Sequence, residues 1–155
     1  TPEQIEKLKK ALSLFVGTKS YHNFTIGKSA SDVSSKRFIR SFDLSMEEPI
    51  VRPDGTEWLR LRVHGASFML HQIRKMVALA VLAVRYQLNT ETIFTAAFSP
   101  DVRMNIPKAP AVGLYLDKAV FDGYTKYLEK QTEKSAEGAS PIDFGRVEQA
   151  REHLK

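Results

Sequence analysis

The chain has 155 residues, 43% of them hydrophobic, which suits one domain built on a single core. Its formal net charge of +5 and pI near 9.5 allow a polyanionic partner such as RNA without requiring one. The absence of cysteine excludes disulfides, a thiolate nucleophile and cysteine-based metal sites, and the four histidines show no ligand spacing, so no metal is expected.

The start of the chain and its apolar runs give further expectations. Thr1 is not a start methionine, which predicts a piece of a longer protein, and the first residues lack the charged and apolar stretches of a signal peptide. The longest apolar window, residues 77–84, is too short to span a bilayer, so we expect a core helix there and no membrane partner.

The first predicted element is an amphipathic helix. Thr1, Pro2 and Gln4 supply an N-cap, a proline at the first helical position and the far side of a capping box. Apolar residues recur at helical spacing as far as Phe15, and we expect Gly17 to end the helix. The polar segment 18–35 predicts a loop. Its aromatic cluster comprises Tyr21, His22 and Phe24, which either stack on RNA or pack on a core, and for Phe24 we favour packing.

A β-hairpin is predicted next. Residues 37–47 and 57–64 alternate apolar and polar side chains, as strands with one face on the core do, and the turn at 53–55 contains Asp54 followed by glycine. Asp54 therefore has an ordinary turn role. The opposite face of the hairpin is basic, and it is either solvated or in contact with RNA; its arginines are Arg37, Arg40, Arg60 and Arg62.

The segment 66–86 predicts a long core helix with an unusual basic stripe, formed by Ser67, His71, Arg74, Lys75 and Ala78. An arginine left unpaired in a core costs several kcal/mol, so Arg74 requires an anion. That anion is either a carboxylate of this chain or a group supplied from outside it. Lys75 either extends along the helix edge or touches phosphate, and we expect His71 to be a hydrogen-bonded member of the stripe in preference to an acid or base.

The rest of the chain predicts shorter elements. Asn89 or Thr90 caps a short helix that Ser99 and Pro100 close, and a proline-punctuated segment, 105–113, leads into a strand, 114–121. We expect a charged helix at 123–134, a linker at 135–140 and a polar helix at 141–155. The whole indicates an α+β (mixed α/β) fold, an antiparallel sheet flanked by helices.

Four motifs, in order along the chain, resemble the C-terminal half of the catalytic domain of TruA-type tRNA pseudouridine synthases. The amino-acid sequence of the third motif resembles the eukaryotic multisite branch of that family. The motifs are Gly17-Thr18 with His22-Asn23-Phe24, then Arg37-Phe38-Ile39, then Gly65 to Met76, and then Pro107-Lys108-Ala109-Pro110 with Gly113 to Leu116. The resemblance covers residues 1–125, and residues 126–155 are expected to be a charged helical extension.

The resemblance implies an isomerase that converts uridine to pseudouridine in RNA without cofactor or metal. A flipped-out uridine would enter a cleft whose nucleophile is an aspartate. By motif, Arg74 would pair with that aspartate, which would lie in an N-terminal half absent from this chain, and Leu114, which spacing alone would place in a core, would pack near the base. The residues expected to contact tRNA, and possibly other RNA, are His71, Lys75, Tyr21, His22, Arg37 and Lys108.

The same resemblance implies a nuclear protein, with the mitochondrion as an alternative, and it predicts that the chain alone is inactive. Two other functions stay open at this point. One is a non-catalytic RNA-binding module, and the other is a protein-interaction domain whose basic strand face binds an acidic partner.

Overall fold

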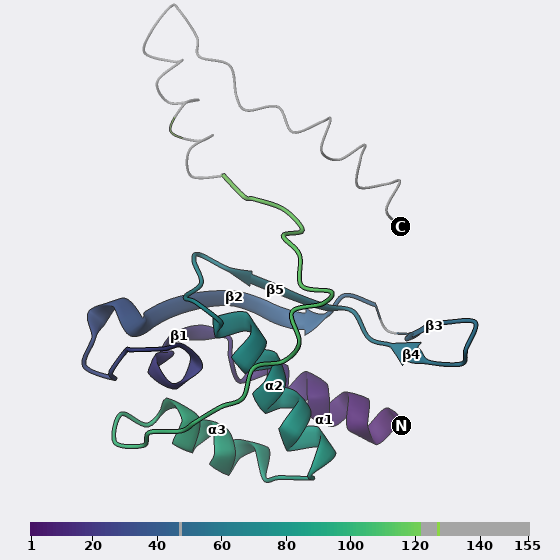
Figure 1. The fold of residues 1–155 in the computed structure, drawn as a ribbon, viewed down its shortest axis with the longest axis horizontal. Helices are drawn as coiled ribbons and strands as arrows, with labels where there is room; N and C mark the ends of the chain where they lie inside the picture. The colour runs from purple at the N-terminus through teal and green to yellow at the C-terminus, as the bar shows by residue number, and fades with distance from the viewer. Residues whose placement is uncertain (47, 122–126, 128–155) are drawn as a thin grey trace, which may run out of the picture. The chain divides into compact units, whose positions relative to one another are not determined.

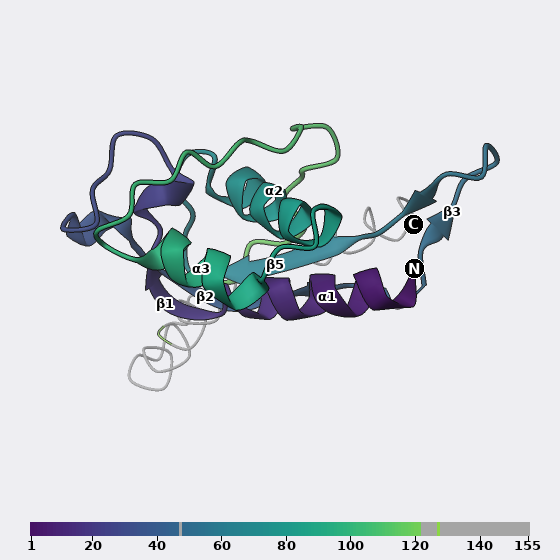
Figure 2. The ribbon, with the colours of Figure 1, turned by 90° about the horizontal axis from the view of Figure 1, so that it is seen from below.

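The computed structural model describes residues 1–46, 48–121 and 127. The chain divides into two units, Thr1–Gly113 and Leu114–Lys155. The first unit confirms the predicted α+β class: its antiparallel sheet has the strand order β1-β2-β5, and Figures 1 and 2 show the helices α1, α2 and α3 on one side of that sheet. None of the helices in the described ranges is long and apolar enough to cross a membrane.

Helix α1 spans Pro2–Ser13 and begins with the predicted capping box between Thr1 and Gln4. It ends before Gly17, which instead opens strand β1, Gly17–Ser20. The prediction of a loop from residue 18 was therefore wrong at its start. Of the four residues of β1 only Thr18 favours a strand, and their pairing with β2 defines them as one. Two short 3₁₀ turns follow, η1 at His22–Phe24 and η2 at Val33–Ser35.

The predicted hairpin is present, in two parts. Strand β2, Lys36–Leu44, pairs with β5, Leu61–Gly65, and an outer pair consists of β3, Ile50–Val51, and β4, Glu57–Trp58. The register of β2 against β5 shifts between Ile39 and Ser41, so that Ile39 and Phe42 are both buried. The predicted end of the first strand, residue 47, lies outside the described residues.

Helix α2 spans Gln72–Arg85 and begins later than predicted. His71 precedes it with a left-handed backbone, φ 63°, while the Gln72 side chain accepts a hydrogen bond from the Met69 amide and the Gln72 amide donates to the Met69 carbonyl. This turn stops the helix from extending back to Ala66. Ser67 and His71 therefore do not belong to a helical stripe with Arg74, and that part of the prediction was wrong.

Helix α3, Thr90–Phe98, confirms the predicted short helix, with Asn89 as its N-cap and Ser99 at its end. The strand predicted at 114–121 was wrong, because these residues pair with no described strand. Alternation of apolar side chains does not make a strand without a hydrogen-bonding partner. The elements predicted beyond residue 122 lie outside the described residues, apart from Tyr127.

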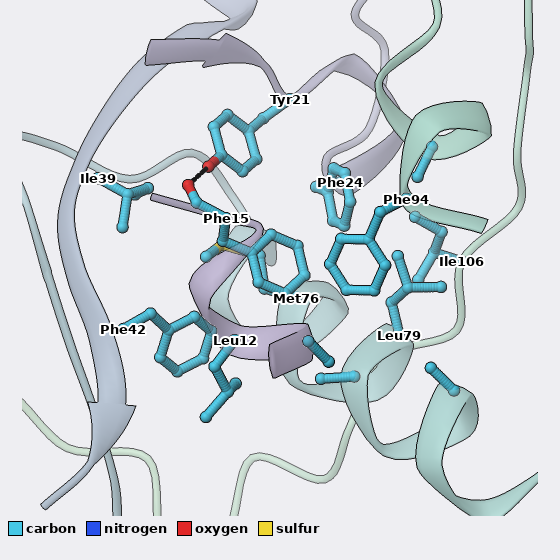
Figure 3. Packing of buried hydrophobic residues seen from close by; sticks show 14 of the residues in the cluster. Leu12, Phe15, Tyr21, Phe24, Ile39, Phe42, Met76, Leu79, Phe94 and Ile106 are labelled. Atoms are coloured by element: carbon cyan, nitrogen blue, oxygen red, sulfur yellow. Dashed lines mark hydrogen bonds between the residues drawn. The ribbon is translucent and has the colours of Figure 1, made fainter. Parts of the chain in front are cut away.

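The core of the first unit is centred on Phe15, which follows α1 (Figure 3). Its ring lies 5.5 Å from that of Phe24, 5.7 Å from that of Phe42 and 4.8 Å from that of Phe94, between ring centroids. The Tyr21 hydroxyl donates to the Phe15 carbonyl, so this buried phenol has its hydrogen bond. Aromatic side chains from separate segments thus hold α1, α3 and the sheet together.

Candidate anion-binding site at the start of helix α2

Four basic side chains gather where α2 begins, and we call them the basic cluster. Three of them, His71, Arg74 and Lys75, come from the start of the helix, and Lys108 comes from the extended segment 105–113. Their charges act on one another, since Lys108 disfavours protonation of both His71 and Lys75. The amino end of a helix adds partial positive charge. The cluster therefore favours an anion.

Arg74 is half-buried and binds the segment 105–113 at two points. Its Nε donates to the Ala109 carbonyl at 2.6 Å, and the Ala109 amide donates back to the Arg74 carbonyl at 3.1 Å. Among the residues that the structure describes, no carboxylate forms an ion pair with Arg74. The alternative of a structural ion pair within the described chain is therefore not supported. Within the described residues no hydrogen bond engages the two outer nitrogens of the guanidinium, so their donors are available to a ligand.

Lys75 faces the interior of the protein. It is 8% exposed, and its Nζ donates to the carbonyls of Asn23, at 3.2 Å, and Thr25, at 3.0 Å. Burial, and next the charge of Lys108, lower the pKa of Lys75. Both predictions for this residue, a contact with RNA phosphate and an extended position at the helix edge, were wrong. Lys75 instead ties α2 to the turn η1.

Asn23 is a structural residue that belongs to the sequence motif His22-Asn23-Phe24 and for which the sequence predicted no role. Its Nδ2 donates to the carbonyls of Ala97 and Val102, at 3.0 and 2.8 Å, and its Oδ1 accepts from the Met104 amide at 2.9 Å. A polar residue inside an aromatic run was the one available signal. Through Asn23 and Lys75, η1 holds both α2 and the segment that leads to Lys108.

His71 and Lys108 are the members of the cluster best placed for a ligand. His71 is half-buried and Lys108 is exposed. Burial, then the charges of Lys108, Arg74 and Lys75, lower the pKa of His71. A bound anion would offset these charges and favour the protonated imidazole, so that His71 could add a charge-assisted hydrogen bond. The cluster is suited to a carboxylate or a phosphate.

Other predicted RNA contacts lie elsewhere. Tyr21 is fully buried in the core, so its predicted stacking on RNA was wrong, and Phe24 is buried as expected. His22 is 8% exposed, and its Nδ1 lies 3.1 Å from the Ser20 hydroxyl, which leaves it almost no surface for RNA. Arg37 is half-buried, and its Nη1 donates to the carbonyls of Ser34 and Lys36. A contact between Arg37 and RNA stays a prediction.

Two further residues complete the comparison with the sequence. Leu114 is 48% exposed and belongs to the second unit, so its packing against a base stays a prediction. Asp54 confirms its turn role: it is exposed, and its carboxylate accepts the Thr56 amide at 2.9 Å, which lowers the pKa of Asp54. No group of three or more His, Asp or Glu side chains within the described ranges is arranged to hold a metal ion.

Comparison with known proteins adds an independent finding. The sequence profile of the family described as tRNA pseudouridine synthase matches residues 11–122. The chain is 42% identical to a tRNA pseudouridine synthase 1 of Yarrowia lipolytica over 82% of its length and 23% of the relative's. It is 40% identical to that of Candida glabrata over 98% and 26%, and 44% identical to a tRNA pseudouridine(27/28) synthase of Saccharomyces cerevisiae over 83% and 32%. The chain thus spans about a quarter to a third of these relatives.

Proposed function

Because the chain belongs to the tRNA pseudouridine synthase family, we propose that it forms one wall of an active site that isomerises uridine to pseudouridine in tRNA. The observation that supports this proposal is the environment of the Arg74 side chain. Its side chain is held by Ala109, while the described residues provide no carboxylate for its remaining donors. This arrangement is the one expected of an active-site arginine that pairs with a carboxylate from another part of the protein.

The proposed roles divide between chemistry and binding. The isomerisation moves the glycosidic bond of uridine from N1 to C5 of the base, and the nucleophilic aspartate would come from the remaining part of the catalytic domain. Arg74 would orient that aspartate and stabilise its charge, and Leu114 would pack against the base. His71 and Lys108 would contact RNA phosphate, and neither a metal nor a cofactor takes part in this scheme.

The partners and the location are also proposals. The relatives' names point to tRNA as the substrate, and other RNA remains a further candidate. The second partner would be the remaining part of the same catalytic domain. We propose a nuclear location, with the mitochondrion as the alternative, which fluorescence microscopy of the tagged longer protein would test. The boundary proposed after residue 125, before a charged extension at 126–155, falls where the structure describes only Tyr127.

The experiment uses the longer protein that contains this chain. Arg74→Met should reduce tritium release from 5-tritiated uridine in tRNA by at least about a hundredfold while tRNA still binds, because the arginine orders the nucleophile. Arg103→Met is the matched control, since Arg103 is exposed in the same unit. Equal activity in the two variants would contradict the proposal. Binding of tRNA without turnover in the unmodified protein would instead favour the non-catalytic module.

A further inference from the structure

The hairpin β3–β4 carries an exposed tryptophan that the proposed active site does not use. Figures 1 and 2 show this hairpin extending beyond the end of the three-stranded sheet, away from α2 and α3. Trp58, the only tryptophan of the chain, is 49% exposed there. Ile50, 40% exposed, lies beside it on β3, so the hairpin presents more than one apolar side chain to the solvent.

The Trp58 ring has a defined setting. Trp58 lies directly opposite Ile50 in the register of β3 and β4, so the two share one face of the hairpin, and Arg52, two residues along, lies on the same face. The Arg52 guanidinium lies over the indole, with its central carbon 5.6 Å from the ring centroid. The turn is held by the bond from Thr56 to the Asp54 carboxylate and by the bond from the Arg52 amide to the Thr56 carbonyl.

We propose that the face of the hairpin formed by Ile50, Arg52 and Trp58 is a stacking platform for an unpaired base of the RNA substrate. The proposal rests on the proposed function in that it takes RNA as the substrate. Proteins recognise unpaired bases by stacking them on aromatic rings and arginine planes, and Arg52 can add a contact to the adjoining phosphate. A second exposed pair of this kind lies on β2, where Arg40 is 5.5 Å from the ring centroid of Phe38.

The size and charge of the hairpin favour a base over a protein partner. The two strands have two residues each, whereas a stable protein interface buries about 800 Å² on each side. A single base needs little more than the area of one ring. The carboxylates of the hairpin do not occupy this face, so it is open to an anion. Glu57 lies opposite Val51 in the strand register, on the other face of the hairpin, and the Asp54 carboxylate accepts a hydrogen bond from the Thr56 amide.

The test exploits the fact that Trp58 is the only tryptophan of the chain. Titrating the 155-residue chain with a tRNA transcript should quench the indole fluorescence, while a blunt RNA duplex should leave it unchanged, because stacking requires an unpaired base. Arg52→Gln should weaken the quenching. Val51→Ala is the matched control on the other face of the hairpin and should retain it.

A second measurement uses the longer protein. Trp58→Leu should weaken tRNA affinity by roughly tenfold, and this loss should persist in high salt because stacking releases few counterions. Unchanged tRNA affinity in Trp58→Leu would overturn the stacking proposal. So would indole fluorescence that changes when the protein is diluted but does not change when tRNA is added. The proposed function is judged separately, by tritium release from the unmodified longer protein: its absence would contradict that function, whatever the tryptophan reports.

Discussion

At the scale of single residues, Asn23 has the clearest energetic role. Its side chain makes three hydrogen bonds to backbone groups of α3 and the following segment, and all three would be lost in Asn23→Ala. We expect the free energy of unfolding to fall by about 3 kcal/mol, because buried backbone groups would be left without partners. Urea denaturation measures this change. Asn105→Ala, at an exposed position, is the control and should change the value by less than about 0.5 kcal/mol.

His71 links stability to pH. The pKa of His71 is lowered in the folded state from an ordinary value of 6.5, so the unfolded chain takes up this proton first as the solution is acidified. Stability should therefore decline as the pH falls below about 6.5 and continue to decline until the folded state is also protonated. His71→Asn should remove this part of the decline, since asparagine tolerates the left-handed backbone at this position. Melting temperatures measured across this range test it, and identical pH dependence in the two proteins would contradict it.

At the scale of elements, Gly65 controls how β5 passes into the turn before α2. A side-chain carbon at this position would lie 2.9 Å from the Phe68 ring and 3.0 Å from Ile39, both closer than such atoms normally approach. Gly65→Ala should lower the stability by about 2 kcal/mol and the melting temperature by several degrees. Calorimetry measures it against Ala66→Ser, an exposed neighbour. A loss as large in the control would show that the crowding at Gly65 is not the cause.

The elements differ in how well residues close in sequence predict their boundaries. The starts of α1 and α3 were predicted, because an N-cap side chain bonds to an amide only a few residues away. The start of α2 was not, because its turn depends on the approach of Gly65 to Phe68 and on the bond between Met69 and Gln72. Strand β1 was missed for a related reason, since it depends on pairing with β2.

The candidate site shows the same division. The expectation that Arg74 requires an anion followed from the cost of burying charge and stays a prediction, and the structure adds the bond to Ala109. The direction of Lys75 and the burial of Tyr21 could not be predicted, because a motif does not show which side chains turn toward the core. In both residues the polar atom donates to a backbone carbonyl, that of Phe15 six residues before Tyr21 and that of Asn23 fifty-two residues before Lys75.

At the scale of the whole molecule, the chain should be inactive alone. In the proposed function the nucleophile would come from outside the chain, and we expect that Asp54, whose carboxylate is engaged in an exposed turn, does not replace it. The purified chain should release no tritium from 5-tritiated uridine in tRNA above the background without protein. Release that disappears in Asp54→Asn would contradict this prediction and would place the nucleophile within the chain.

The sheet has a consequence for handling the chain by itself. Strand β5 pairs with β2 along one side, and along its other side no described strand accepts or donates its backbone hydrogen bonds. Such an edge is a template on which another strand can add, in the same chain or in a neighbouring copy. When no other part of the protein covers the edges of this sheet, separate copies would join along β5 or along β1, the other edge strand, so solubility and aggregation would depend on concentration. Co-expression with a part of the protein that covers such an edge would then reduce aggregation, because that part would pair with the edge strand before another copy of the chain does.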